Sequence, residues 1–92
     1  MKDIAQRVFD IEIASLKEVA ALIDDDFVQA VQAIQHINGK LVVAGIGKSG
    51  IIGKKIAATL SSTGTQSFFL HPGEAFHGDL GMVGPHLSLI HI

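Results

Sequence analysis

A glycine-rich turn, Gly45-Ile46-Gly47-Lys48-Ser49-Gly50, holds the first residues whose types and spacing could bind a ligand. Glycines let the backbone leave a strand sharply and approach a ligand closely, and a following helix presents its free N–H groups there. This arrangement suits a phosphate group, to which Lys48 and Ser49 would add a cation and a hydroxyl. The alternative is that the glycines only form the turn and that Lys48 points into solvent.

Two nucleotide-binding motifs resemble this turn but fail on a second requirement. The spacing Gly45-x-Gly47-x-x-Gly50 matches the dinucleotide fingerprint, which alone is weak. That fingerprint also needs an acidic residue where the second strand ends, and the chain reads Phe-Phe-Leu-His-Pro over 68–72. A nucleotide P-loop would need a glycine at position 42, which is Val42. The turn therefore predicts a phosphate site of another kind.

Two histidines, His71 and His77, form the second group of candidate residues, in a loop that also contains Glu74 and Asp79. His71 follows the second predicted strand, at the same edge of the sheet as the glycine turn. Ligands of open α/β sheets collect outside the carboxyl ends of the strands. A single histidine most often has a capping or surface role. Two in one loop beside a phosphate turn favour a shared functional site.

The elements that must position these residues are two short apolar runs and the helix between them. Residues 41–44 and 67–70 read as strands buried on both faces, as in a parallel sheet. Residues 49–62 read as a helix, with Ile52, Ile56, Ala57 and Leu60 expected to face inward. Residues 71–82 read as a loop with a short helical piece. Strand, helix and strand form a right-handed βαβ unit.

Two amphipathic helices are predicted before this unit. Apolar residues recur at helical spacing over 3–23, and again from Phe27 to Ile37. Asp24, Asp25 and Asp26 lie between them and are expected to cap the second helix, which Asn38-Gly39 ends.

Composition narrows the possible partners. The 92 residues carry seven Lys and Arg against nine Asp and Glu, a net charge of −2, which argues against general nucleic-acid binding. The absence of cysteine excludes disulfides and thiolate metal sites, and charges throughout residues 1–19 argue against a signal peptide or membrane span, so a cytoplasmic protein is expected. With 48% hydrophobic and only 17% charged residues, apolar faces are expected to be covered by further chain or a partner subunit.

The motifs together resemble a known family. The glycine turn, Ile56-Ala57-Ala58-Thr59, Ser62-Thr63-Gly64-Thr65, His71-Pro72-Gly73-Glu74-Ala75 and His77-Gly78-Asp79-Leu80-Gly81-Met82 are similar to the sugar isomerase (SIS) domain of arabinose-5-phosphate isomerases. The resemblance covers residues 3 to about 85. It implies an α/β, flavodoxin-like three-layer sandwich with a parallel sheet, preceded by two N-terminal helices.

The resemblance also implies a reaction and partners. The family interconverts D-ribulose 5-phosphate and D-arabinose 5-phosphate, for 3-deoxy-D-manno-octulosonate and lipopolysaccharide synthesis. Its members are cytoplasmic tetramers that bind a small phosphosugar, with neither nucleic acid nor membrane as a partner. No cofactor is required, and Zn²⁺ binds and inhibits some members. A non-catalytic phosphosugar-binding SIS module and a related isomerase with another substrate stay open as alternatives.

The family's functional residues carry over by position. Lys48 and His77 match catalytic positions. The positions that match substrate contacts are Ser49, Gly64, Thr65, His71 and His77. His71 also matches a zinc-contacting position.

The chain departs from the family pattern after Pro85. In the family, a third strand should follow and end in a Ser-Asn-Ser-Gly-Glu loop that grips phosphate and supplies a catalytic glutamate. Here the sequence reads His-Leu-Ser-Leu-Ile-His-Ile over 86–92. We therefore expect an N-terminal helical segment over 1–39, the first βαβ half of the SIS domain over 40–85, and a non-family tail over 86–92. On this interpretation the domain is truncated after its first βαβ unit, and the chain is an incomplete enzyme fragment.

Overall fold

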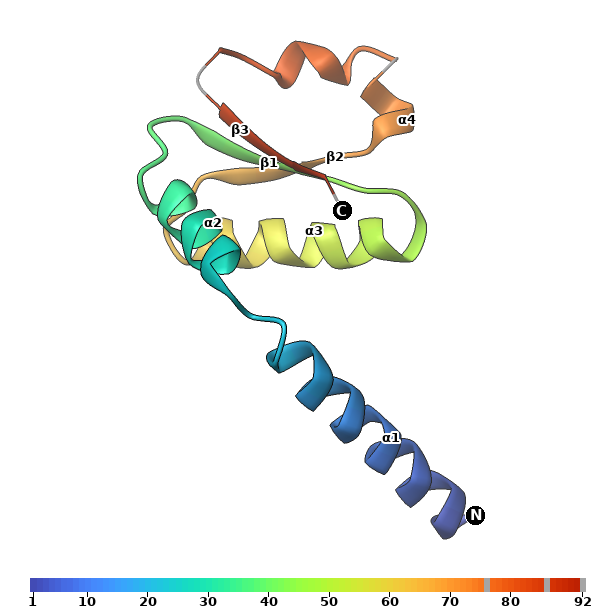
Figure 1. Cartoon of the computed structure of the whole chain (residues 1–92). Coiled ribbons are helices and arrows are strands. Elements are labelled where there is room, and N and C mark those ends of the chain that lie inside the picture. The colour runs from blue at the N-terminus through green and yellow to red at the C-terminus, as the bar shows by residue number, and fades with distance from the viewer. Residues whose placement is uncertain (76, 86, 92) are drawn as a thin grey trace. The chain divides into compact units, whose positions relative to one another are not determined.

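Five helical and three extended segments make up the chain in a computed structural model that describes residues 1–75, 77–85 and 87–91 (Figure 1). In order they are α1 (Lys2–Ala20), α2 (Asp25–Gln35), β1 (Lys40–Ala44), α3 (Gly47–Ser62), β2 (Ser67–Leu70), α4 (Pro72–Ala75), the 3-10 helix η1 (Asp79–Met82) and β3 (Leu87–His91). The chain divides into two compact units, residues 1–32 and residues 33–92. None of the described helices is long and apolar enough to cross a membrane.

The two N-terminal helices form close to the predicted positions. Helix α1 has no buried residue, and apolar side chains along it, such as Phe9 and Leu16, are about two-thirds exposed. The Asp24 carboxylate accepts the backbone N–H of Asp26 at 3.0 Å, next to the first residue of α2. This contact confirms that the aspartates cap α2, because it satisfies one of the N–H groups that a helix start leaves unpaired.

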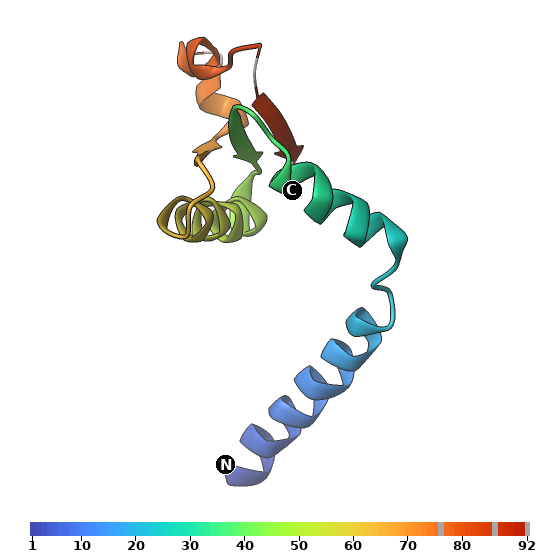
Figure 2. The ribbon, with the colours of Figure 1, turned by 90° about the vertical axis from the view of Figure 1, so that its left-hand side faces the viewer.

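The sheet has the strand order β2-β1-β3 with all strands parallel. Strand β1 lies in the centre, and its Leu41, Val42 and Val43 are fully buried. Alternate residues point to opposite faces. Leu41 and Val43 pack with Ala57 of α3, whereas Val42 packs with Ala75 of α4. Figure 2 shows α3 on one side of the sheet and α4 with η1 on the other. The predicted α/β class with a parallel sheet in a layered arrangement is confirmed.

Helix α3 packs on the sheet largely through glycines. The predicted inward positions of Ala57 and Leu60 are confirmed, whereas those of Ile52 and Ile56 are wrong. Its buried residues are Gly50, Gly53 and Ala57, whereas Ile52 is 58% and Ile56 is 39% exposed. A Cβ at Gly50 would lie 2.8 Å from the Gly45 carbonyl oxygen, so only glycine admits this close approach. The face of α3 that carries the smallest side chains packs against the sheet, and Ile52 and Ile56 are therefore exposed.

The segment after Pro85 contributes a third strand. Leu87–His91 pairs in parallel with β1 along its whole length, from Lys40 opposite Leu87 to Ala44 opposite His91. The sequence assigned these residues to a tail that lacks the family's third strand. The structure places a strand there. Three of the four residues over 87–90 are apolar, and such a short apolar run is consistent with a strand. The non-family origin of the tail stays a prediction.

Candidate functional site

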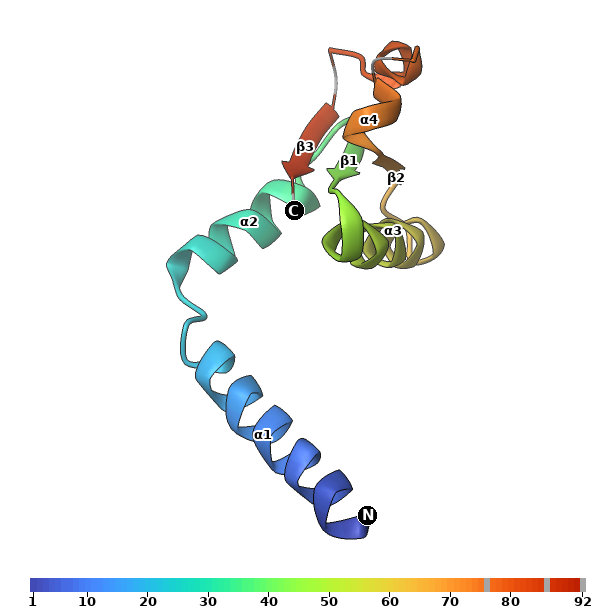
Figure 3. The ribbon, with the colours of Figure 1, turned by 90° about the vertical axis from the view of Figure 1, so that its right-hand side faces the viewer.

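The carboxyl edge of the sheet brings together the glycine turn and His71, two of the features predicted to form a site. Strand β1 ends at Ala44 and leads into the glycine turn, and its neighbour β2 ends at Leu70, opposite Ala44, and leads into His71. Because the strands are parallel, both connections leave the same edge (Figure 3). The predicted position of His71 beside the glycine turn is therefore confirmed.

The glycine turn presents the start of a long helix. Gly47 has φ +66°, a left-handed conformation that favours glycine, and it opens the 16-residue helix α3. No side chain caps this end, and the preceding Ile46 is extended. The first N–H groups of α3 therefore remain available to a ligand, at the positive end of the helix dipole.

Two cavities open on the surface of the second unit, residues 33–92. Their volumes are about 370 Å³ and about 230 Å³, and the smaller one lies at the glycine turn. Its lining residues are Gly47, Gly50, Ile51, Lys54, Phe69 and His71. The sequence predicted His71 and the glycines but missed Lys54. The signal that could have found it is helical spacing, since residues 47, 50, 51 and 54 fall on one face of α3.

His71 is held in place by the start of α4. Its Nδ1 accepts the backbone N–H of Gly73 at 3.0 Å, and its carbonyl oxygen accepts the N–H groups of Glu74 at 3.0 Å and Ala75 at 3.1 Å. A neutral imidazole has one donor and one acceptor nitrogen. Since Nδ1 is the acceptor here, the ring's proton is on Nε2, and the exposed imidazole offers an N–H donor to a ligand.

Lys48 and Ser49 occupy the first turn of α3, where both are exposed, and neither lines the cavity. Successive helical residues turn by about 100°, so Lys48 and Ser49 point away from the face that Gly47 and Gly50 share. The structure thus places both residues in the glycine turn and outside the cavity that opens beside it.

His77 lies in the exposed turn after α4, and its backbone N–H donates to the Glu74 carbonyl at 2.9 Å. The four-residue helix α4 separates it from His71. Its side chain does not line the cavity at the glycine turn.

Gly64 and Thr65 lie at the other edge of the sheet. They follow α3 and precede β2, so they are near the amino ends of the strands. Gly64 has φ +107°, and the Thr65 N–H donates to the Leu60 carbonyl at 2.9 Å, which closes the helix. A 16-residue helix rises by about 24 Å, so these residues are a helix length away from the glycine turn.

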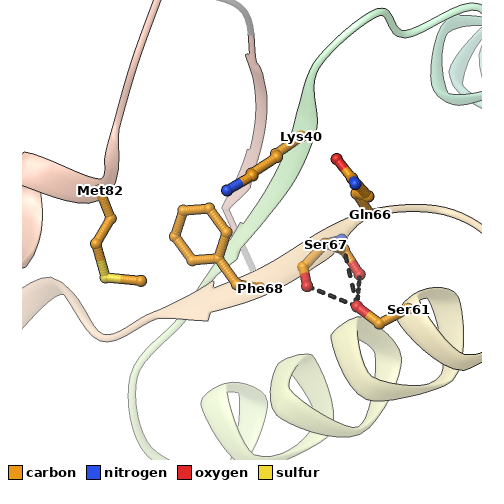
Figure 4. Close-up of a pocket in the computed structure, with 6 residues that line it drawn as sticks. All are labelled: Lys40, Ser61, Gln66, Ser67, Phe68 and Met82. Atoms are coloured by element: carbon orange, nitrogen blue, oxygen red, sulfur yellow. Dashed lines mark hydrogen bonds between the residues drawn. The ribbon is translucent and has the colours of Figure 1, made fainter.

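The larger cavity also lies at this amino edge, and Figure 4 shows its lining residues Lys40, Ser61, Gln66, Ser67, Phe68 and Met82. The Ser61 hydroxyl donates to the Ser67 carbonyl at 2.6 Å, and the Ser67 hydroxyl donates to the Ala57 carbonyl at 2.6 Å. These hydroxyls tie α3 to β2. Of these two cavities the smaller is the better candidate site, because it joins the start of α3 to His71, a side chain predicted to bind a ligand.

Zinc does not fit the residues around His71 as they stand. Within the described ranges, no three His, Asp or Glu side chains are grouped so that they could hold a metal ion. Zinc on Nε2 would require the ring's proton to move to Nδ1, where the Gly73 N–H already points. A metal at this ring would have to break that hydrogen bond.

Comparison with known proteins agrees with the fold and the motifs. The chain is 59% identical over 73 residues to arabinose 5-phosphate isomerase GutQ of Escherichia coli K12, and 54% identical over 79 residues to arabinose 5-phosphate isomerase KdsD of Pseudomonas aeruginosa. These matches cover 79% and 86% of this chain, but the chain spans only about a quarter of either relative, 23% and 24%.

A solved structure is also similar. A protein of Escherichia coli CFT073, in complex with A5P, superposes with a TM-score of 0.82 at 43% identity, covering 98% of this chain and 50% of that one. The SIS domain family model matches residues 34–92, which include β1, α3, β2, β3 and both candidate cavities. The chain therefore belongs to the SIS domain family.

Proposed function

We propose that the chain is part of an isomerase that interconverts D-ribulose 5-phosphate and D-arabinose 5-phosphate. The observation that carries the proposal is the cavity at the carboxyl edge, where the free start of α3 meets the Nε2 donor of His71. A phosphosugar offers this cavity a phosphate and several oxygens that accept hydrogen bonds. The names of the similar isomerases and the A5P complex of the similar structure support the same substrate.

The reaction assigns roles to the residues around the glycine turn. Aldose–ketose isomerisation moves a proton between neighbouring carbons through an enediol, so it needs a base and a group that stabilises a developing oxyanion. We assign oxyanion stabilisation to the Lys48 ammonium and proton transfer at the sugar oxygens to His77. His71 donates to a sugar oxygen through Nε2, and Ser49 contacts the phosphate.

Gly64 and Thr65 fit this assignment only in an assembly. They lie a helix length from the glycine turn of their own chain. We therefore propose a homo-oligomer, a tetramer as in the family, in which these residues contact a sugar bound by another subunit. Apolar side chains exposed on α3, such as Ile52 at 58%, support such an assembly.

The proposal also includes inhibition by zinc bound at His71 and a location of the protein in the cytoplasm. Zinc would act as an inhibitor at His71 only after the Gly73 hydrogen bond is broken, and it has no part in the steps above. A cytoplasmic location follows from the substrate, because phosphosugars are made and used inside the cell.

Turnover in the full-length gene product tests the proposal, with conversion of D-arabinose 5-phosphate followed by ¹H NMR. Lys48→Ala should lower kcat by about 10²- to 10³-fold while KM changes little, because its charge matters most as the oxyanion develops. Lys55→Ala, on the same helix with its ammonium bonded to Thr59, is the matched control and should keep wild-type kcat. An unchanged kcat with a raised KM in Lys48→Ala would make Lys48 a phosphate contact.

One observation favours a second function, a phosphosugar-binding SIS module without catalysis. The cavity is lined by binding groups, whereas Lys48 and His77 lie outside it. In that case D-arabinose 5-phosphate would bind to the wild-type protein with no conversion to D-ribulose 5-phosphate.

A further inference from the structure

Two serine side chains connect the end of α3 with the start of β2, on either side of the turn that carries Gly64 and Thr65 (Figure 4). The Ser61 hydroxyl donates to the Ser67 carbonyl oxygen at 2.6 Å and accepts the Ser67 backbone N–H at 3.3 Å. A single side chain thus binds both backbone polar groups of Ser67, the first residue of β2. The chain over 62–66 is therefore closed at its base by one residue of the helix.

The Ser67 side chain adds a second attachment to α3. Its hydroxyl donates to the carbonyl oxygen of Ala57, a buried core residue, at 2.6 Å. Ala57 and Ser61 are separated by about one turn of the helix. A serine hydroxyl has one proton to donate, so neither hydroxyl can replace the hydrogen bond of the other. The start of β2 is therefore attached to two successive turns of α3, and loss of either serine side chain removes one attachment.

The orientation of the turn between the two serines depends on these attachments. Gly64 is exposed, has φ +107° and leaves open space around an added Cβ. On the side of α3, the Thr65 N–H donates to the Leu60 carbonyl oxygen at 2.9 Å. On the side of the sheet, the Gln66 carbonyl oxygen accepts the Leu41 N–H at 2.9 Å. One end of the turn is thus fixed to each element, and the distance between α3 and β2 sets how Gly64 and Thr65 are presented to a ligand.

We propose that Ser61 and Ser67 are positioning residues, which hold Gly64 and Thr65 in the conformation that contacts the phosphosugar. The inference rests on the proposed function for the role of Gly64 and Thr65, and the two serines do not themselves touch the sugar. A turn that is already ordered loses little conformational freedom when the ligand binds, whereas a loosened turn has to be ordered at that moment. Removal of either hydroxyl should therefore weaken binding without altering any group that the sugar contacts.

Calorimetric titration of the full-length gene product with D-arabinose 5-phosphate tests the proposal. Ser61→Ala and Ser67→Ala should each weaken binding by about three- to tenfold, the range expected when one further side chain has to be ordered on binding. Ser67→Thr keeps the hydroxyl, and its methyl group has room in the cavity that Ser67 lines, so this variant should retain most of the affinity. Ser62→Ala is the matched control and should bind as the wild type does, because the Ser62 hydroxyl donates to the Thr59 carbonyl oxygen of its own helix at 3.0 Å.

A double-mutant cycle with Thr65→Ala separates positioning from plain stabilisation. Thr65→Ala should itself weaken binding. Ser67→Ala added to it should weaken binding by less than about twofold further, because the contact that Ser67 positions is already lost. The urea concentration at half-unfolding should nevertheless fall in both backgrounds, since Ser67→Ala removes the hydrogen bond to the Ala57 carbonyl oxygen in each.

The outcomes separate this inference from the proposed function. Wild-type affinity in Ser67→Ala would make the serines stabilising contacts alone and overturn the inference. An equal loss of affinity from Ser67→Ala with and without Thr65→Ala would also overturn it, because Ser67 would then act by another route. If the wild type does not bind D-arabinose 5-phosphate, the proposed substrate is wrong, and hydrogen–deuterium exchange of the segment 62–68 decides the inference. Faster exchange in Ser67→Ala than in Ser62→Ala would then support it, and equal exchange would overturn it.

Discussion

At the scale of single residues, the hydrogen bond from Gly73 to His71 fixes what the imidazole can do. With Nδ1 accepting the Gly73 N–H, the neutral ring is a donor at Nε2. A donor suits a sugar hydroxyl, a carbonyl or a phosphate oxygen, whereas a zinc ion needs a lone pair at the same nitrogen. A hydrogen-bonded substrate oxygen therefore requires the His71 tautomer protonated at Nε2, whereas zinc at Nε2 requires the tautomer protonated at Nδ1.

This difference makes the tautomer of His71 a measurable property. We expect ¹⁵N NMR of the full-length gene product to show an unprotonated Nδ1 and a protonated Nε2 in the neutral ring. Added Zn²⁺ that binds His71 should shift the Gly73 amide resonance, because that hydrogen bond must break, and D-arabinose 5-phosphate should reverse the shift. His71→Ala is the control and should abolish it. A ring protonated at Nδ1 would contradict the assignment.

At the scale of elements, α3 connects the two edges of the sheet and depends on glycine for its position. Gly50 meets the end of β1, and a Cβ at Gly53 would lie 3.2 Å from both Val43 and Phe69. Glycines in a helix interior cost conformational entropy relative to alanine. At these two positions the close contact with the sheet offsets that cost.

Gly50→Ala should therefore destabilise the protein, although alanine is the better helix former. The new methyl would lie 2.8 Å from the Gly45 oxygen, and overpacking of this kind costs about 1–3 kcal/mol, against roughly 1 kcal/mol of gained helix propensity. Urea unfolding of the full-length gene product measures the difference. Gly84→Ala, with no atom within 4 Å of the added Cβ, is the control. A Gly50→Ala variant as stable as the wild type would show that α3 can shift away from the sheet.

The elements also show what the sequence could and could not predict. The strand over 67–70 and the glycine turn were predicted because apolar runs and glycines act locally. The inward face of α3 was half right: Ala57 is buried and Leu60 packs against the core, whereas Ile52 and Ile56 are exposed because Gly50 and Gly53 set the distance to the sheet. Lys54 was missed because a lysine in a helix is usually solvated, and only the pairing of β2 with β1 puts Phe69 beneath it.

At the scale of the whole molecule, the chain buries few apolar residues. The buried hydrophobic residues of the described chain are Leu41, Val42, Val43, Ala44, Ala57, Leu70 and Ala75. Larger apolar side chains of both units stay exposed, among them Phe9 at 66% and Ile51 at 66%. So much exposed apolar surface is characteristic of a protein surface that contacts another chain or further chain of its own.

We therefore expect the isolated 92-residue chain to be molten or to self-associate. Near-UV circular dichroism should be weak and one-dimensional NMR signals broad, because few side chains have fixed neighbours. The full-length gene product, measured in the same buffer, is the comparison and should give sharp signals and a cooperative melt. A dispersed, monomeric spectrum with a cooperative melt for the 92-residue chain would contradict this expectation.

The strand order β2-β1-β3 also has a consequence for the route by which the sheet assembles. Strand β2 follows β1 after a single helix, whereas β3 reaches the opposite side of β1 only after β2, α4 and η1. The entropy lost on closing a loop grows with its length, by about 0.6 kcal/mol for each doubling. We therefore expect β1 to pair with β2 over α3 first, and β3 to dock onto this pair afterwards. The segment expected to fold first and the glycine turn thus belong to the same βαβ unit.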